Sequence, residues 1–266
     1  MTKLISKTMN NFPIYKKHVN GLVNHAISTG KNPNLADTMR CQMEIVPALL
    51  PLKNANFMAS TATDYGHNCV AAARWATCKQ VYRFDHDFAK ELARQGLPNE
   101  IPTSPLSALP YPIIFVSVSF NTLGFNMEGE CVPASCCGFA AWADAGMPGQ
   151  PDSVVIMPIG KDADTSHPSQ PTFRIPLSEI TFTDYFDALF GNIKKQLEIP
   201  CQQEAGFEET LRKAYEETLS MVVNCLLFIL ADNADVKTVF IPKHGPCYER
   251  MKMSPLGLLI LSPSRT

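Results

Sequence analysis

Long hydrophobic runs, excess charge of either sign and basic clusters are all missing from this sequence of 266 residues. The longest apolar stretch, residues 219–231, is interrupted by Asn224 and is shorter than the roughly 20 residues that a membrane-spanning helix needs. Residues 1–17 contain no apolar core of signal-peptide length. The formal net charge is −2 and no polybasic run occurs, which argues against broad electrostatic binding of nucleic acid. We therefore expect a cytoplasmic protein that does not associate with a membrane.

Apolar residues are plentiful, and they indicate a folded chain with a substantial core. They make up 45% of the sequence against 18% charged residues, which excludes wholesale disorder. The nine cysteines are scattered and odd in number, so we expect reduced thiols that act mostly as small buried apolar groups. The 21 prolines cluster in residues 98–112 and 148–176, which indicates loop-rich connections.

Helical patterns dominate the first eighty residues. Three helices are predicted, over residues 14–28, 35–46 and 61–79, and Gly30 is placed to end the first of them. The second helix should end before Pro47, and its apolar residues at helical spacing are Leu35, Met39, Met43 and Val46. His18 and His25 lie seven residues apart on one helix face. Because no third ligand accompanies them, we predict surface positions for both.

From residue 81 onward the pattern changes to strands with intervening helices. Asp85 is predicted to cap a short helix after the strand 81–84, and Gly96 to end that helix in a left-handed conformation. Further strands are predicted at residues 113–118, 137–143, 153–159, 172–175 and 237–241. Further helices are predicted at 183–197, capped by Thr183, and at 203–231.

These elements predict an α+β fold with a mostly antiparallel sheet packed with helices and a helical N-terminal portion. We expect a single domain over residues 1–266, in which residues 1–80 form the helical portion and 81–266 the α+β body. No internal repeat and no low-complexity linker divides the sequence.

Several clusters of reactive side chains have simpler explanations than catalysis. Asp85, His86 and Asp87 resemble a metal motif, but a cap and first-turn charge account for both aspartates. Cys136 and Cys137 could present a nucleophile with His86 or His167 as the base, yet they lead directly into a predicted strand. We therefore predict no catalytic residues, no metal and no cofactor, and keep a cysteine-dependent hydrolase as an alternative.

Aromatic residues are the best candidates for contacts with a partner. Phe139 and Trp142 are three residues apart in a strand, so their side chains should point to opposite faces. If Trp142 faces outward, it could anchor a bound peptide, whereas the alternative is that both aromatic residues are packed inside. The candidate partner-binding residues are Phe139, Trp142 and the neighbouring Asp144.

Five blocks of this sequence, in their order along the chain, resemble a family of phage and mobile-element proteins, that of the second type V-A anti-CRISPR protein. The blocks are Tyr82-Arg83-Phe84-Asp85 with the helix that follows, Ile101-Pro102 with Leu109-Pro110-Tyr111-Pro112, Gly138-Phe139-Ala140-Ala141-Trp142, Arg174-Ile175-Pro176-Leu177 with the helix 184–197, and the apolar helix 219–230 with residues 231–236. Members of that family typically continue into a basic tail rich in His, Arg and Trp, which this sequence lacks after residue 256. A nucleic-acid role of such a tail is therefore not expected here.

The resemblance implies a non-enzymatic protein acting in a bacterial host cell. It implies recognition of the N-terminal peptide of the type V-A Cas effector nuclease as this peptide emerges from the translating ribosome, with loss of the effector's messenger RNA. The alternative that keeps the fold is a phage accessory protein that binds another host or phage protein.

Overall fold

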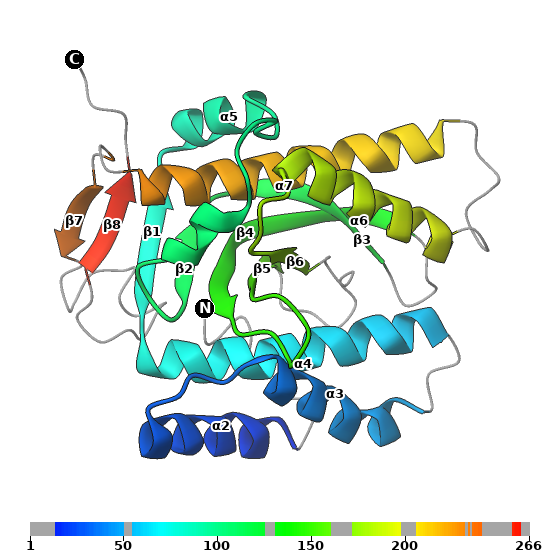
Figure 1. Ribbon diagram of the computed structural model, residues 1–266, viewed down its shortest axis with the longest axis vertical. Coiled ribbons are helices and arrows are strands. Elements are labelled where there is room, and N and C mark those ends of the chain that lie inside the picture. The colour runs from blue at the N-terminus through cyan, green and yellow to red at the C-terminus, as the bar shows by residue number, and fades with distance from the viewer. Residues whose placement is uncertain are drawn as a thin grey trace.

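The computed structural model describes residues 14–50, 55–125, 131–160, 172–197, 206–231, 234, 236–240 and 257–261. A sheet lies between two layers of helices (Figure 1). The helices are α2 (Tyr15–Thr29), α3 (Leu35–Leu49), α4 (Ala55–Thr77), α5 (His86–Arg94), α6 (Phe182–Leu197) and α7 (Phe207–Leu230), with a short 3-10 helix η1 (Ser104–Ala108). The strands are β1 (Gln80–Phe84), β2 (Ile114–Ser117), β3 (Phe120–Phe125), β4 (Cys131–Asp144), β5 (Ser153–Gly160), β6 (Phe173–Pro176), β7 (Val236–Phe240) and β8 (Gly257–Leu261).

The sheet is mixed and mostly antiparallel. Its strands follow the order β6-β5-β4-β2-β1-β8-β7, and β3 pairs with β4 beside this path. Among the described strands, β1 pairs in parallel with β2 and with β8, and the other pairings are antiparallel. The α+β class and the antiparallel character predicted from the sequence are confirmed.

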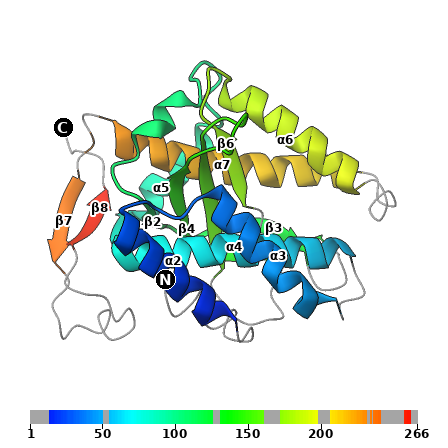
Figure 2. The same ribbon diagram turned by 60° about the horizontal axis from the view of Figure 1, so that its bottom comes forward.

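The two faces of the sheet bury separate cores because side chains alternate along each strand. Ile114 and Val116 of β2 join the core under α5, α6 and α7, whereas Ile113 and Phe115 join the core under α2, α3 and α4. In Figure 2 the layer of α2, α3 and α4 comes forward, with α2 and α3 packed along α4. The helical N-terminal portion is therefore the cover of one sheet face.

Most local signals in the sequence are confirmed. Asp85 accepts hydrogen bonds from the amides of Asp87 and Phe88, at 3.0 and 3.2 Å, and Gly96 follows α5 with a φ of 71°. Gly30 ends α2 with a φ of 67°. The cap predicted at Thr183 is wrong, since the hydroxyl of Thr181 accepts from the amide of Asp184 at 3.1 Å. The two threonines lie two residues apart, and the helix begins one residue earlier than predicted, at Phe182.

The predicted end of α3 is wrong. The helix continues through Pro47 to Leu49, because a proline disfavours helical geometry in its predecessor without forbidding it. Its buried face consists of Thr38, Cys41, Ile45 and Leu49. Met39 and Met43, two of the apolar residues at helical spacing, are 41% and 66% exposed. Both sets of residues have helical spacing, and the set with more apolar residues contains the two exposed methionines.

Strand β8 was not predicted at all. It lies between β1 and β7, so that the last described strand enters the sheet beside the first one. The strand prediction for residues 237–241 corresponds to β7, although residue 241 lies outside the described residues, as do His167 and its loop. Across the described ranges, no helix combines the length and the apolar character needed to cross a membrane.

Candidate functional site

The three residues proposed for partner contacts all lie in the interior. Phe139 and Trp142 have no exposed surface and point to opposite faces of β4, as their spacing predicts. Trp142 does not face outward, so it is not a surface anchor for a peptide. The alternative prediction, that both aromatic rings are packed inside, is confirmed. Asp144, at the end of β4, is 1% exposed.

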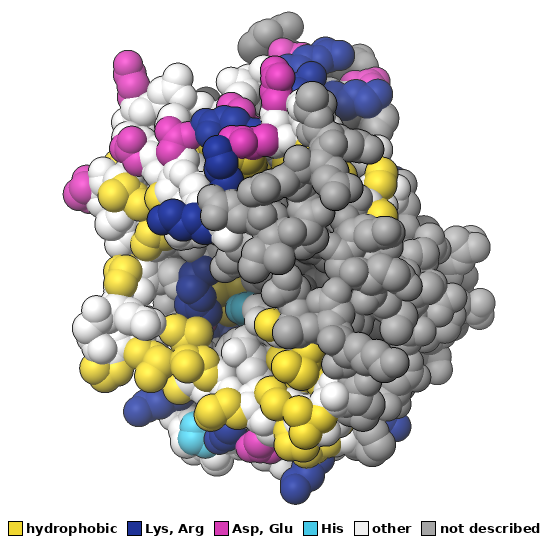
Figure 3. All heavy atoms as spheres, turned by 90° about the vertical axis from the view of Figure 1, so that its right-hand side faces the viewer, with side chains coloured by type: hydrophobic (Ala, Val, Ile, Leu, Met, Phe, Trp, Pro, Cys, Tyr) yellow, Lys and Arg dark blue, Asp and Glu magenta, His cyan; other side chains and the backbone are white. Residues whose placement is uncertain are grey.

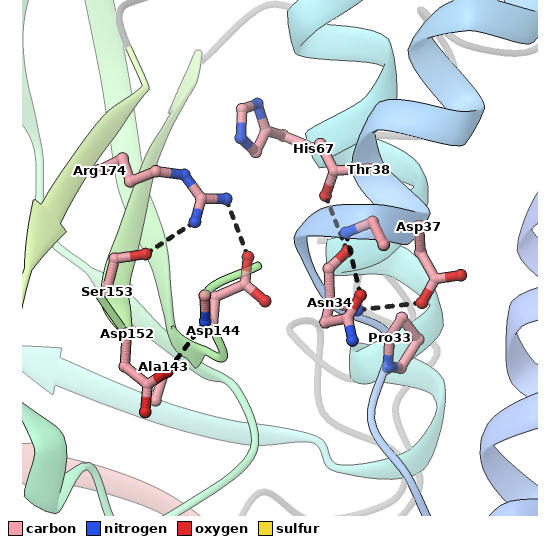
Figure 4. Close-up of polar contacts among 12 residues, drawn as sticks. Pro33, Asn34, Asp37, Thr38, His67, Ala143, Asp144, Asp152, Ser153 and Arg174 are labelled. Atoms are coloured by element: carbon pink, nitrogen blue, oxygen red, sulfur yellow. Dashed lines mark hydrogen bonds and ion pairs between the residues drawn. The ribbon is translucent and has the colours of Figure 1, made fainter. Parts of the chain in front are cut away.

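Asp144 is the centre of a buried charge network, and Figure 4 shows its contact with Arg174. Arg174 of β6 donates from Nη2 to Asp144 Oδ2 at 2.8 Å and from Nη1 to Ser153 Oγ at 2.7 Å. A second guanidinium, that of Arg74 on α4, lies 3.7 Å from Asp144 Oδ1. Burial raises the pKa of Asp144, and the two arginines together with the amide of Leu35 oppose this rise. One carboxylate thus faces two cations from different elements.

Arg74 also joins three segments that are distant in the sequence. Its guanidinium donates to the carbonyl oxygens of Pro33, Pro112 and Ala143, each at 2.8 Å. These carbonyls belong to the loop before α3, the loop before β2 and the end of β4. Burial lowers the pKa of Arg74 to about 10, which still leaves the side chain charged at neutral pH.

His67 of α4 faces this network and is 93% buried, with 7% of its surface exposed. Its Nδ1 donates to the Thr63 carbonyl at 3.0 Å, so Nε2 carries a free lone pair in the neutral tautomer. Burial, followed by the charge of Arg174, lowers the pKa of His67 to about 4. The imidazole ring lies 6.3 Å from the indole of Trp142, between ring centroids. A neutral imidazole is therefore held beside an arginine.

Buried polar atoms without a hydrogen-bond partner occur around His67 and Asp144. In the described part of the chain, four buried side-chain atoms lack a hydrogen-bond partner, namely His67 Nε2, Trp142 Nε1, Asp144 Oδ1 and Thr172 Oγ1. The strand register aligns Trp142 of β4, Val155 of β5 and Arg174 of β6 in one row, and Thr172 immediately precedes β6. Strand β6 ends the strand order. We call the set of His67, Trp142, Asp144, Thr172 and Arg174 the sheet-edge site.

Unpaired buried polar atoms are rare in folded proteins and usually have a partner such as water or a ligand. The sheet-edge site offers a lone pair on His67, an N–H group on Trp142 and a guanidinium on Arg174 whose side chain is 30% exposed. A ligand that suits it must supply both acceptors and donors. Figure 3 shows a hollow in this side of the molecule, with a basic side chain and a histidine inside it and hydrophobic side chains along its lower rim.

His67, Arg74 and Arg174 were not among the functional residues predicted from the sequence. A usable signal existed for both arginines, because each is the single charge in a short apolar segment: Arg74 in residues 69–76 of α4 and Arg174 in residues 173–177 around β6. A buried charge of this kind requires a partner. His67 carried no such signal, since its burial depends on how α4 packs on the sheet.

Comparison with known proteins decides the family. The family model described as AcrVA2-like, the anti-CRISPR type V subtype A2 family, matches residues 82–248, which are 167 of the 266 residues. The chain belongs to this family. A solved structure described as the crystal structure of AcrVA2 is similar in fold, with a TM-score of 0.56, 13% sequence identity, and coverage of 97% of this chain and 82% of the other. No curated protein matches the sequence.

Membership of the AcrVA2-like family supports an anti-CRISPR function, and this family is not a known class of enzymes. The cysteines considered as nucleophiles are poorly placed for catalysis. Cys136 is fully buried inside β4, and Cys137 Sγ donates to the Gly160 carbonyl at 3.7 Å. Of the bases considered with them, His167 and the side chain of His86 lie outside the described residues.

Proposed function

We propose that this chain is an anti-CRISPR protein that binds the N-terminal peptide of the type V-A Cas effector during translation and lowers the effector's expression through loss of its messenger RNA. The observation that carries the proposal is the family match over residues 82–248. The anti-CRISPR type V subtype A2 family name connects this chain to type V-A systems, and the absence of a polybasic run favours a protein target over nucleic acid.

We further propose that the peptide binds at the sheet-edge site. The main chain of a peptide presents carbonyl acceptors and amide donors in alternation, which is the combination that Trp142 Nε1, Arg174 and His67 Nε2 require. An edge strand such as β6 also offers main-chain groups to an added strand, a common mode of peptide recognition. Specificity would then come from side chains of the peptide that enter the hollow seen in Figure 3.

Isothermal titration of the full chain with a synthetic peptide of the effector's N-terminus tests the binding step. We expect saturable binding, weakened at least tenfold by Arg174→Gln, because the guanidinium is the exposed cation of the site. Arg94→Gln is the matched control, since Arg94 is exposed on α5 and belongs to the opposite layer. No binding of the wild-type chain at high micromolar peptide would remove this target.

A reporter assay tests the expression step. The chain is expressed with a reporter that carries the N-terminal codons of the effector, and reporter messenger RNA is measured. We expect a loss of this RNA that disappears when the codons are frame-shifted to change the peptide while preserving most of the nucleotide sequence. Equal loss from both reporters would mean that RNA sequence and not peptide is recognised.

A second candidate is binding of a different host or phage protein with the same fold. The observation that favours it is the 13% identity to AcrVA2, which conserves the fold but leaves most surface side chains different. Affinity purification from a host that expresses both this chain and the type V-A effector separates the two, because only the first proposal predicts recovery of the nascent effector.

A further inference from the structure

Three side chains with metal-binding atoms converge inside the helical layer, away from the sheet-edge site. They are His18 of α2, Cys41 of α3 and Cys69 of α4, and their ligand atoms all lie within 4.8 Å of one another. All three are buried, with Cys41 at 1% and Cys69 at 0% exposure. The surface position predicted for His18 is therefore wrong, since this residue is 9% exposed. Two thiols and an imidazole at this separation form a donor set typical of zinc, which binds sulfur at about 2.3 Å and nitrogen at about 2.0 Å.

The orientation of His18 fits a metal ligand. Its Nε2 lies 2.6 Å from the Glu44 carboxylate, to which an N–H at this position donates. This contact leaves the lone pair of Nδ1 directed inward, where the Tyr65 hydroxyl lies 2.9 Å away. Ligating histidines characteristically donate their other ring nitrogen to a carboxylate, which fixes the ring and the tautomer.

The scaffold around these side chains is built for close approach of the helices. Cys69 and Tyr65 are four residues apart on α4, so they share the face that meets α2 and α3. Glu44 follows Cys41 by three residues and therefore lies on the same side of α3. Gly66 of α4 allows close contact with α3, because a Cβ there would lie 2.6 Å from the Thr38 carbonyl oxygen and from Gln42 Cγ.

We propose that His18, Cys41 and Cys69 bind one Zn²⁺ ion that cross-links α2, α3 and α4. The Tyr65 hydroxyl, which lies 2.9 Å from His18 Nδ1, is placed beside the fourth position, and Glu44 positions the imidazole from outside. The role of the ion is structural, because the ligands are buried and come from three helices. Both thiols release their protons when the metal binds.

Cobalt substitution tests this site on the full chain purified under reducing conditions. Wild-type protein titrated with Co²⁺ should take up one equivalent and develop the near-ultraviolet thiolate-to-cobalt charge-transfer band, with visible bands of tetrahedral cobalt, and added Zn²⁺ should remove them. Glu44→Gln should weaken metal binding about 10- to 100-fold while leaving all three ligands in place. Cys41→Ser should abolish the charge-transfer band, whereas the control Cys78→Ser, outside the cluster, should retain it.

The cobalt spectrum of the wild-type protein tests the proposed site even if Cys41→Ser fails to fold. Absence of charge transfer from the reduced wild-type protein overturns the proposal, and so does a band that persists unchanged in a folded Cys41→Ser variant. Thermal unfolding gives an independent readout, since a chelator should lower the midpoint of the zinc-loaded wild-type protein but not that of Cys41→Ser. Equal midpoints with and without chelator in zinc-loaded wild type would contradict the structural role.

Discussion

At the scale of single residues, buried charged side chains connect segments on the side of the sheet covered by α2, α3 and α4. Arg74 reaches three carbonyl groups and one carboxylate that belong to three different segments. Few residues can do this, because a guanidinium offers five N–H donors in a fixed plane and stays charged when buried. Arg74 therefore connects α4 to the loop before α3, the loop before β2 and the end of β4.

Replacing Arg74 by methionine should cost about 3–5 kcal/mol of unfolding free energy, the range observed when one partner of a buried ion pair is removed. The loss should be measured by urea unfolding. Arg83→Met, on an exposed position of β1, is the control and should change stability by less than about 0.5 kcal/mol. A similarly small loss for Arg74→Met would show that the network does not hold these segments.

His67 should make stability depend on pH. Its folded pKa of about 4 is below the unfolded value of 6.5, so between these values the unfolded chain binds a proton that the folded chain does not. Stability should therefore fall by about 3 kcal/mol as the pH drops from 6.5 to 4, since each pKa unit corresponds to about 1.4 kcal/mol. His67→Gln should flatten this part of the unfolding profile, whereas exposed His25→Gln should not. Identical profiles for wild type and His67→Gln would contradict the assignment.

The chemistry of individual residues was also what the sequence predicted best. The cap at Asp85 and the stops at Gly30 and Gly96 depend only on neighbouring residues, and all three are confirmed. The cap at Thr183 failed because two threonines lie within three residues, and sequence chemistry does not distinguish them. The sheet-edge site needed more than local chemistry, because α4, β4 and β6 each supply part of it.

At the scale of secondary-structure elements, two buried features fix how neighbours meet. Gly138 occupies a bulge in β4, where the register with β5 shifts between Cys136 and Gly138. A Cβ at Gly138 would collide with the Val116 carbonyl oxygen and lie 2.8 Å from the Phe115 ring. The bulge lets the long strand β4 continue from its pairing with β3 to its pairing with β2 and β5.

Gly138→Ala should destabilise the fold by about 1–3 kcal/mol, because a side chain there meets backbone that cannot move freely. The matched control is Gly21→Ala in α2, where a Cβ would have open space and helix propensity favours alanine by about 0.5–1 kcal/mol. Thermal unfolding should therefore show opposite shifts for the two variants. Shifts of the same sign would refute this reading of the bulge.

Asn224 links α7 to α5 on the other face of the sheet. Its Nδ2 donates to the carbonyls of Leu92 and Gly96, both at 2.8 Å, which satisfies the C-terminal end of α5. Asn224→Ala should cost about 1–3 kcal/mol, because the carbonyls of Leu92 and Gly96 each lose a buried hydrogen bond. Asn192→Ala, at an exposed position of α6, serves as the control. Hydrogen exchange should also accelerate in α5 of the Asn224 variant, and unchanged exchange there would speak against the link.

The existence of most elements could be predicted, but the choice of buried face and of strand partners could not. Two interleaved sets of residues on α3 had helical spacing, and the inward set contains Thr38 and Cys41, whose burial depends on α4. Likewise β8 pairs in parallel with β1 from more than 170 positions away in the chain. Long-range pairing of this kind leaves no local pattern.

At the scale of the whole molecule, the sheet separates two different chemistries. The face under α5, α6 and α7 is a conventional apolar core, with Phe186 and Phe190 stacked and Arg212 lying over both rings. The opposite face holds the charge network, the unpaired polar atoms and the proposed zinc ligands. Function is therefore expected in the layer formed by α2, α3 and α4 and the strands they cover.

Hydrogen–deuterium exchange of the full chain, with and without the effector's N-terminal peptide, tests the central claim most directly. Binding at the sheet-edge site predicts slower exchange in β6, at Phe173–Pro176, and in the part of α4 around His67, with little change in α5 or α7. Protection confined to α5 and α7, or no protection at a saturating peptide concentration, would contradict the claim.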